Sequence, residues 1–396
     1  MRHLVTCSCT VLVLAGLLFP NGAIGQPWPT NGWRVSTPEK LKLRPGVLAQ
    51  LDGDIARGKY GNTNGMLIIR RGEVAYDRAY PHDYDRIYSE QKRKPSSLNA
   101  HDFGGPYNYF NSWWHPFYRR GKLHTMQSIT KTVTSAVIGV AVSRSEFPAL
   151  DTPVLKYFPP GKIENLDDRK MRMTIRHLLT MTAGLDWHED LPFTDPRNTG
   201  MDMEAQADWI SYVINRPMSD EPGARFNYNS GATVLLAHIF QKATGQDVEE
   251  YAAKHLFAPL GIVDHFWKRA PRGLPDSQGG LYLEAHDLAK IGYLFHKNGV
   301  WEGKQILTAA WVKDSLSPSA TVSEVTGVKY GLKWWLYPYD KTLLAYVAVG
   351  FGGQKLIIIP EHDLIVVFTD WNIPSKGSIS TSEAITRVLA AVEDRN

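Results

Sequence analysis

Two residues three positions apart, Ser128 and Lys131, have the types and the spacing that nucleophilic catalysis needs. They open an apolar stretch, residues 128–142, that predicts a buried helix. A serine at a helix N-terminus faces free backbone N–H groups, and a lysine three residues later lies on the same face. Burial of that face would disfavour the charged lysine, so that a neutral amine could take the serine proton. The alternative is that Ser128 only caps the helix and Lys131 is solvated.

A second copy of the same pattern, Ser89 and Lys92, shows how often this spacing arises without function. Charged residues and Pro95 follow Ser89, so no helix is predicted there. The basic runs 92–94 and 119–122 are typical of solvated loops. With a net charge of +4 and no long basic stripe, the 396-residue chain does not resemble a nucleic-acid-binding protein.

The elements that must position Ser128 and Lys131 divide along the chain into strands at both ends and helices in the middle. Apolar periodicity predicts a hairpin from Met66–Arg70 and Glu73–Tyr80. Further strands are predicted at 330–336, 343–349, 354–359 and 364–368, and helices at 175–181, 203–214, 232–243, 248–256, 285–297 and 382–392. We therefore expect an α/β (α+β) fold, with an antiparallel sheet from both termini flanked by helices and an inserted all-helical domain. The expected domains are 36–145 with 275–396 (α/β) and 146–274 (helical).

The segment 81–123 has no clear period and is rich in Tyr, Trp, His and Pro. A loop of that length inside a folded unit usually covers something. Trp113, Trp114 and His115 either roof the site or pack the loop onto the surface.

Residues 1–25 have the layout of a secretory signal peptide, with a basic start, an apolar core from Val11 to Phe19 and a small-residue end, Ala23–Gly25. The predicted localisation is secreted or periplasmic. An uncleaved anchor is the alternative, and it would be the only membrane association. Both cysteines, Cys7 and Cys9, lie in this segment, so no disulfide is expected in the remainder.

Longer stretches of the chain carry a family resemblance. They are MQSITKTVTSAVIGVA, MTIRHLLTMTAGLDW, PGARFNYNSGATVLLAHIFQKATG, GGLYLEAHDLAKIGYLFHKNGVWEGKQIL and VGFGGQKLIIIPEHDLIVV. In this order they resemble the serine β-lactamase-like superfamily, which includes class C β-lactamases, D-Ala-D-Ala carboxypeptidases, family VIII esterases and 6-aminohexanoate-dimer hydrolases. The resemblance implies a β-lactamase/transpeptidase-like fold.

The resemblance also implies roles for individual residues. Ser128 would be the nucleophile, Lys131 the general base and Tyr228 the proton shuttle to the leaving group. The backbone N–H groups of Ser128 and Phe351 would form the oxyanion hole. Neither a metal nor a cofactor is implied, and the partner would be a small-molecule substrate. The residues expected to border that substrate are Trp187, Asp186, Ser230 and Gly350, with Glu189 and Asp190 as further loop acids that are either ligands or solvated.

Two departures from the lactamase pattern concern the substrate. Ser230 stands where lactamases carry the Asn of Y-x-N, and Ala348 and Val349 replace the Lys and Thr of K-T-G. A β-lactam carboxylate would meet no cation there, so an ester or small linear amide is the expected substrate. The alternatives are a β-lactamase or D-Ala-D-Ala carboxypeptidase, and a non-catalytic penicillin-binding or sensor module. The sequence has neither a G-x-S-x-G nor an H-E-x-x-H motif.

Overall fold

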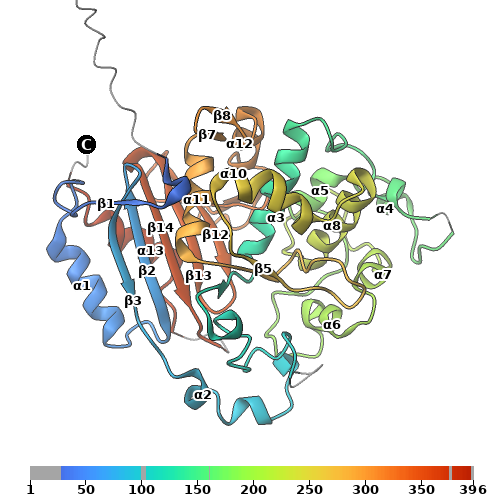
Figure 1. Cartoon of the computed structure of the whole chain (residues 1–396). Helices are drawn as coiled ribbons and strands as arrows, with labels where there is room; N and C mark the ends of the chain where they lie inside the picture. Colours follow the sequence, from blue (N-terminus) through green and yellow to red (C-terminus); the bar gives the residue numbers. More distant parts are fainter. Residues whose placement is uncertain (1–27, 100–103, 160, 374–376, 394–396) are drawn as a thin grey trace, which may run out of the picture.

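The computed structural model describes residues 28–99, 104–159, 161–373 and 377–393. The predicted signal peptide, residues 1–25, lies outside the described residues. The strands of the largest sheet are β1 (Arg34–Val35), β2 (Thr63–Arg70), β3 (Glu73–Ala79), β9 (Ala320–Thr321), β10 (Lys329–Tyr330), β11 (Trp335–Pro338), β12 (Leu344–Gly350), β13 (Gln354–Ile359) and β14 (Leu364–Asp370). Their order is β1-β3-β2-β14-β13-β12-β11-β10-β9. Figure 1 shows the part of the sheet that contains β3, β2, β14, β13 and β12.

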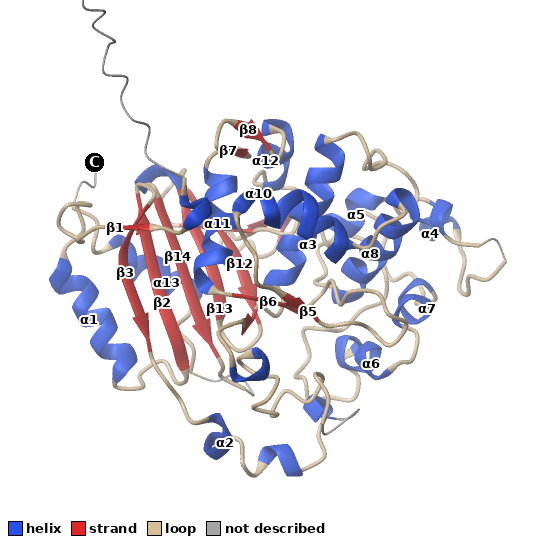
Figure 2. Ribbon diagram, viewed as in Figure 1, coloured by secondary structure: helices blue, strands red, loops and turns tan. Residues whose placement is uncertain are grey.

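This sheet joins the two ends of the chain, as expected. β14 pairs with β2, bringing Ile365 opposite Ile69, and every neighbouring pair is antiparallel except β1 with β3. Figure 2 shows the sheet as one layer beside the mostly helical middle of the chain. The fold class that the sequence predicts is confirmed.

Helices cover both faces of the sheet and fill the middle of the chain. They are α1 (Pro45–Ala56), α2 (Tyr84–Ile87), α3 (Ile129–Ser143), α4 (Asp168–Met171), α5 (Ile175–Leu179), α6 (Thr199–Ala205), α7 (Trp209–Ile214), α8 (Ser230–Thr244), α9 (Val248–Ala252), α10 (Ala258–Leu260), α11 (Ala285–His296), α12 (Ala309–Ser315) and α13 (Thr381–Leu389), with a π-helical turn at Ala253–Phe257. Short 3-10 turns lie at Pro29–Asn31, Gln91–Arg93, Ser97–Asn99, Tyr118–Arg120, Val154–Tyr157 and Pro360–His362. None of the helices in the described ranges has the length and apolarity of a bilayer-crossing segment.

Both faces of the central strands are buried, which explains their continuous apolar runs. Leu356 and Ile358 of β13 face the cluster that contains α3 and α11, whereas Ile357 and Ile359 face the cluster with α1 and α13. The first cluster continues into the helical middle of the chain. The two predicted domains therefore share one core, and their exact boundaries stay a prediction.

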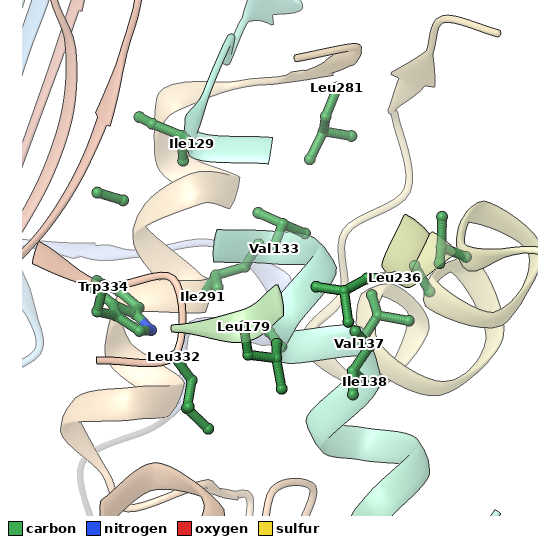
Figure 3. Packing of buried hydrophobic residues seen from close by; sticks show 14 of the residues in the cluster. Ile129, Val133, Val137, Ile138, Leu179, Leu236, Leu281, Ile291, Leu332 and Trp334 are labelled. Carbon is green, nitrogen blue, oxygen red and sulfur yellow. The ribbon is translucent and has the colours of Figure 1, made fainter. Parts of the chain in front are cut away.

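Helix α3 runs through that shared core. Figure 3 shows its residues Ile129, Val133 and Val137 among side chains from α5, α8 and α11. The small strands β4 (His124–Thr125), β5 (Phe266–Trp267) and β6 (Leu281–Leu283) form a separate sheet that leads the chain into α3, and β7 (Val300–Trp301) pairs with β8 (Lys304–Gln305). The N-terminal end of α3 is thus fixed from several sides.

One predicted strand, 330–336, is wrong. The structure has two short strands, β10 and β11, separated by Gly331–Trp334. Lys333 has a left-handed backbone with φ +66°, and the Gly331 amide donates to the Trp334 carbonyl at 2.8 Å. A left-handed residue cannot continue an extended strand, so the apolar run turns back on itself.

Candidate active site

Ser128 lies at the N-terminus of α3, directly after Gln127, whose backbone is left-handed (φ +48°). Its side chain makes no capping hydrogen bond to the helix. Instead its Oγ accepts a hydrogen bond from Lys131 Nζ at 2.8 Å. The alternative of a capping serine beside a solvated lysine is therefore wrong, because Lys131 is only 1% exposed.

Lys131 has contacts from three separate segments. Its Nζ also donates to the backbone carbonyl of Gln278 at 2.9 Å, in the loop before β6. The ring of Tyr228 lies next to it, with its centroid 5.1 Å from Nζ. These contacts bring a hydroxyl, an amine and a phenol from two parts of the chain into one small volume.

Tyr228 lies in the extended segment just before α8, which Asn229 caps through its side chain. Its ring is stacked on Trp335 of β11, with centroids 5.7 Å apart and an interplanar angle of 27°. The backbone amide of the preceding residue, Asn227, donates a hydrogen bond to the Met181 carbonyl at 2.8 Å. The ring of Tyr228 is thus packed against Trp335, and the backbone next to it is anchored to Met181.

The far wall of the site is the end of β12. Gly350 is the last residue of that strand, and Phe351 begins the following turn. Ser128, Gly350 and Phe351 all line a cleft of about 330 Å³, together with Tyr228. Its other lining residues are Glu189, Phe193, Trp335, Val349, Gly352, Gly353 and Ser378.

A smaller pocket of about 40 Å³ adjoins this cleft at Ser128. Leu98 and Tyr109 form part of its wall, so two residues of the long segment 81–123 border the site. Trp113, Trp114 and His115 line neither cavity. The buried ring of His115 is stacked on Trp371, and Trp114 is stacked on Phe266. These two residues therefore pack their loop onto the protein, the second of the two expected roles.

The carboxylate of Glu189 lines both the cleft and the pocket. It accepts hydrogen bonds from the Ser230 amide (2.7 Å), the Ser230 hydroxyl (2.5 Å) and the Trp187 indole (2.8 Å). Ser230 and Trp187 therefore position an acid. Of these three residues only Glu189 and Ser230 border the cavities at Ser128.

Asp186 and Trp187 line neither of the two cavities at Ser128. They line a neighbouring cavity that includes Tyr228, and the Asp186 carboxylate pairs there with Arg216 at 2.6 Å and with His188 at 3.0 Å. Their contact with a substrate stays a prediction. The acid that lines the cavities at Ser128 is Glu189, whose only sequence signal was its membership of the same acidic loop.

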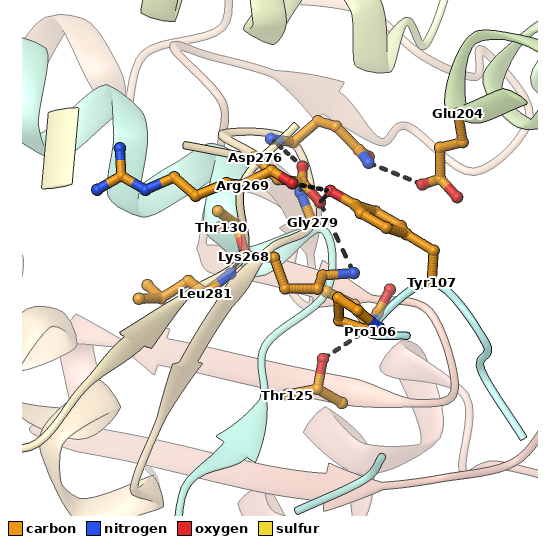
Figure 4. A network of polar contacts seen from close by, with 12 residues as sticks. Pro106, Tyr107, Thr125, Thr130, Glu204, Lys268, Arg269, Asp276, Gly279 and Leu281 are labelled. Carbon is orange, nitrogen blue, oxygen red and sulfur yellow. Dashed lines mark hydrogen bonds and ion pairs between the residues drawn. The ribbon is translucent and has the colours of Figure 1, made fainter. Parts of the chain in front are cut away.

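A largely buried polar network that sequence reasoning missed borders the small pocket (Figure 4). Glu204 accepts hydrogen bonds from Tyr109 (3.0 Å) and from the side-chain amide of Gln278 (2.9 Å). Burial raises the pKa of the Glu204 carboxyl to about 7. Lys268, also buried, lies 3.7 Å from an Asp276 oxygen. Within the described ranges, no group of His, Cys, Asp and Glu has the arrangement of a metal site.

A hydroxyl, a buried amine and a phenol beside the end of strand β12 of the large sheet define the class of serine hydrolases with a β-lactamase-like fold. The model of the Beta-lactamase family matches residues 62–369, and the chain belongs to this family. The superfamily resemblance that the sequence indicates is therefore confirmed.

Relatives and solved structures agree with this assignment. The chain is 23% identical over 282 residues to 6-aminohexanoate-dimer hydrolase of Paenarthrobacter ureafaciens, covering 65% of this chain and 70% of that protein. It is 28% identical over 157 residues to Esterase EstB of Burkholderia gladioli, covering 37% of this chain and 38% of that protein. The octameric penicillin-binding protein homologue from Pyrococcus abyssi has the same fold, with a TM-score of 0.63 at 19% identity over 89% of this chain and 78% of that one.

Proposed function

We propose that this serine hydrolase cleaves esters or small linear amides through an acyl-enzyme on Ser128. The observation that carries the proposal is the 2.8 Å contact from Lys131 Nζ to Ser128 Oγ, in a buried position beside Tyr228. A buried lysine that contacts a serine hydroxyl, without a carboxylate pairing with it in the described ranges, suits a base better than a structural cation.

The proposed reaction has two steps. Lys131 takes the Ser128 proton while Oγ attacks the substrate carbonyl carbon, and the amides of Ser128 and Phe351 hold the oxyanion. The bond to the leaving group then breaks, and the proton passes through Tyr228 to the departing oxygen or nitrogen. In the second step a water molecule gives a proton to the base and attacks the acyl carbon. The bond from that carbon to Ser128 Oγ then breaks, the acid product leaves, and the proton returns to Oγ.

The charged residues that line the two cavities indicate which substrates can bind there. Glu189 supplies a carboxylate, and none of the residues lining the cleft and the small pocket is a lysine or arginine. Ala348, at the position of the lactamase lysine, is fully buried in the core. A carboxylate-bearing β-lactam would be repelled by Glu189 without finding a cation, whereas a neutral ester or an amine-bearing amide would not. The similarity to an esterase and to a 6-aminohexanoate-dimer hydrolase supports the same substrate class.

The test is kcat/KM for nitrocefin beside p-nitrophenyl butyrate and a linear amide with a terminal amine. We expect ester or amide turnover and feeble lactam turnover. A larger kcat/KM for nitrocefin than for the ester and the amide would support the β-lactamase alternative instead. Labelling by penicillin or a fluorophosphonate without any turnover would instead favour the binding-module alternative.

We further propose that the enzyme is exported, on the layout of residues 1–25. N-terminal sequencing of the protein recovered from the medium or periplasm should then begin at Gln26. Recovery of the intact N-terminus in the membrane fraction would support the uncleaved anchor.

A further inference from the structure

Lys333 is a second buried lysine close to the site, in the loop between β10 and β11. Its backbone fastens this loop to α3, because the Lys333 carbonyl accepts a hydrogen bond from Thr132 Oγ1 at 2.7 Å and its amide donates to the Leu179 carbonyl at 3.2 Å. Figure 3 shows its neighbours in sequence, Leu332 and Trp334, in the core near Leu179. The loop is therefore fixed one turn beyond Ser128.

The side chain of Lys333 is 1% exposed and makes two polar contacts. Its Nζ donates to the Leu178 carbonyl at 2.7 Å and to Met181 Sδ at 3.2 Å. Burial, reinforced by the charge of Lys131 and opposed by Glu189, holds the pKa of Lys333 well below its usual value. Neither acceptor carries a charge, and within the described ranges no carboxylate lies at ion-pair distance from Lys333.

Met181 connects Lys333 to the tyrosine. The Met181 sulfur also accepts the Asn229 amide at 3.4 Å, and the Met181 carbonyl accepts the Asn227 amide at 2.8 Å. Asn227 and Asn229 are the residues on either side of Tyr228. Met181 is thus the single residue between the Lys333 amine and the turn that carries Tyr228, because it contacts both.

The same loop reaches Tyr228 from a second direction. Trp335, two residues after Lys333, is the residue on which the Tyr228 ring is stacked. A shift of the loop would move this stacking partner, and a shift of Met181 would move the tyrosine turn. Both movements would change the position of the phenol relative to Lys131 Nζ, which lies 5.1 Å from the ring centroid.

We propose that Lys333 is a positioning residue for the hydrolysis, whose amine ties Met181 to the β10–β11 loop and so keeps Tyr228 in place beside Lys131. This inference rests on the proposed function of Ser128, Lys131 and Tyr228. It assigns Lys333 a part in the reaction without contact to the substrate.

The experiment compares Lys333→Met, Met181→Leu and the double variant, each close in volume to the native side chain. The readouts are the rate at which a fluorophosphonate labels Ser128, and kcat and KM for p-nitrophenyl butyrate. We expect kcat and the labelling rate to fall about 10- to 100-fold in Lys333→Met, the loss that a misplaced group typically causes, with KM within about twofold. We expect the double variant to be little worse than Lys333→Met alone, because both changes break the same connection.

The matched control is Lys170→Met. Lys170, like Lys333, is inaccessible to solvent, and its Nζ donates to two backbone carbonyls, those of Glu164 (2.9 Å) and Ile214 (3.0 Å). It lines neither cavity at Ser128, so this variant should lose stability but keep kcat and the labelling rate.

Equal labelling and kcat in Lys333→Met and the wild type would overturn the proposal, as would equal losses in Lys333→Met and Lys170→Met. If Lys333→Met does not fold, Met181→Leu alone decides, because it must lower kcat with an unchanged KM. Failure of the proposed function is distinguishable, since the wild type itself would then neither be labelled nor turn over the ester.

Discussion

Gly350 lies against the backbone carbonyl of Met126, so closely that a β-carbon at position 350 would overlap the carbonyl oxygen. Met126 stands two residues before Ser128, and Gly350 stands one residue before Phe351. This contact therefore sets the separation of the two amides that we assign to the oxyanion hole. It also explains why glycine ends β12, although the backbone of Gly350 itself does not need a positive φ.

Replacement of Gly350 by alanine should push the end of β12 away from Met126. We expect kcat for p-nitrophenyl butyrate to fall about 10²- to 10³-fold, the usual effect of losing one oxyanion donor. Gly46→Ala is the control, because a β-carbon there meets no atom within 4 Å. Unchanged kcat in Gly350→Ala would show that the strand end can yield without moving the amides.

Ser128→Ala should abolish turnover, with a loss on the order of 10⁴- to 10⁶-fold in kcat, judged by nucleophile removal in other serine hydrolases. The matched control is Ser89→Ala, which alters the second S-x-x-K copy. Ser89 follows the short helix α2, and Lys92 of that copy lies 3.6 Å from Asp85, so neither residue is in the site. Comparable losses in both variants would contradict the assignment of the nucleophile.

Glu189→Gln should change which substrates the enzyme prefers. The amide keeps one oxygen for Ser230 but removes the negative charge from the cleft. We expect kcat/KM for an amine-bearing substrate to fall about tenfold, the effect of losing one charge-assisted contact, while a neutral ester changes about twofold or less. Asp190→Asn, a neutralised acid next in sequence that lines neither cavity, is the control. Equal effects on both substrates would mean that Glu189 is purely structural.

Asp370 should make a contribution to the stability of the protein that falls as the pH rises through the weakly acidic range. Asp370 is fully buried, and burial raises its pKa from 3.8 to about 7 despite the nearby Lys355. Between those values the folded protein holds a proton that the unfolded chain has released, so the free energy of unfolding decreases with rising pH.

Asp370→Asn cannot lose that proton, and its free energy of unfolding should therefore depend less on pH over the same range. Urea unfolding of both proteins at about pH 4, 5.5 and 7 measures the difference. The pH dependence that remains in the variant combines groups of both signs: the raised pKa of Glu204 acts in the same direction as Asp370, whereas burial lowers the pKa of His115 and His124, which acts in the opposite direction. The prediction therefore concerns the difference between the two proteins. Parallel curves for the two proteins would refute the role of Asp370.

Local sequence patterns predicted the elements that carry the site. The apolar residues after Ser128 predicted α3, and the runs at 354–359 and 364–368 predicted β13 and β14 with a turn between them. Such elements follow from periodicity, because side-chain direction repeats every 3.6 residues in a helix and every two in a strand. The spacing of Ser128 and Lys131 belongs to the same local order, so their contact could be expected before the fold was known.

The contacts among distant residues depended on the tertiary structure. Glu189 and Asp186 lie in one loop without a repeating backbone, and only the ion pair with Arg216 and the hydrogen bonds of Ser230 decide which acid faces the nucleophile. Lys333 reads as one polar residue in an apolar strand, yet its left-handed backbone directs it to Met181, which is 152 residues away in sequence. The sequence by itself therefore determined the helices, the strands and the serine–lysine pair, since these depend on near neighbours. Only the packed core decided which acid, which tryptophan and which second lysine surround that pair, because burial and hydrogen bonding act between segments that meet only when the chain folds.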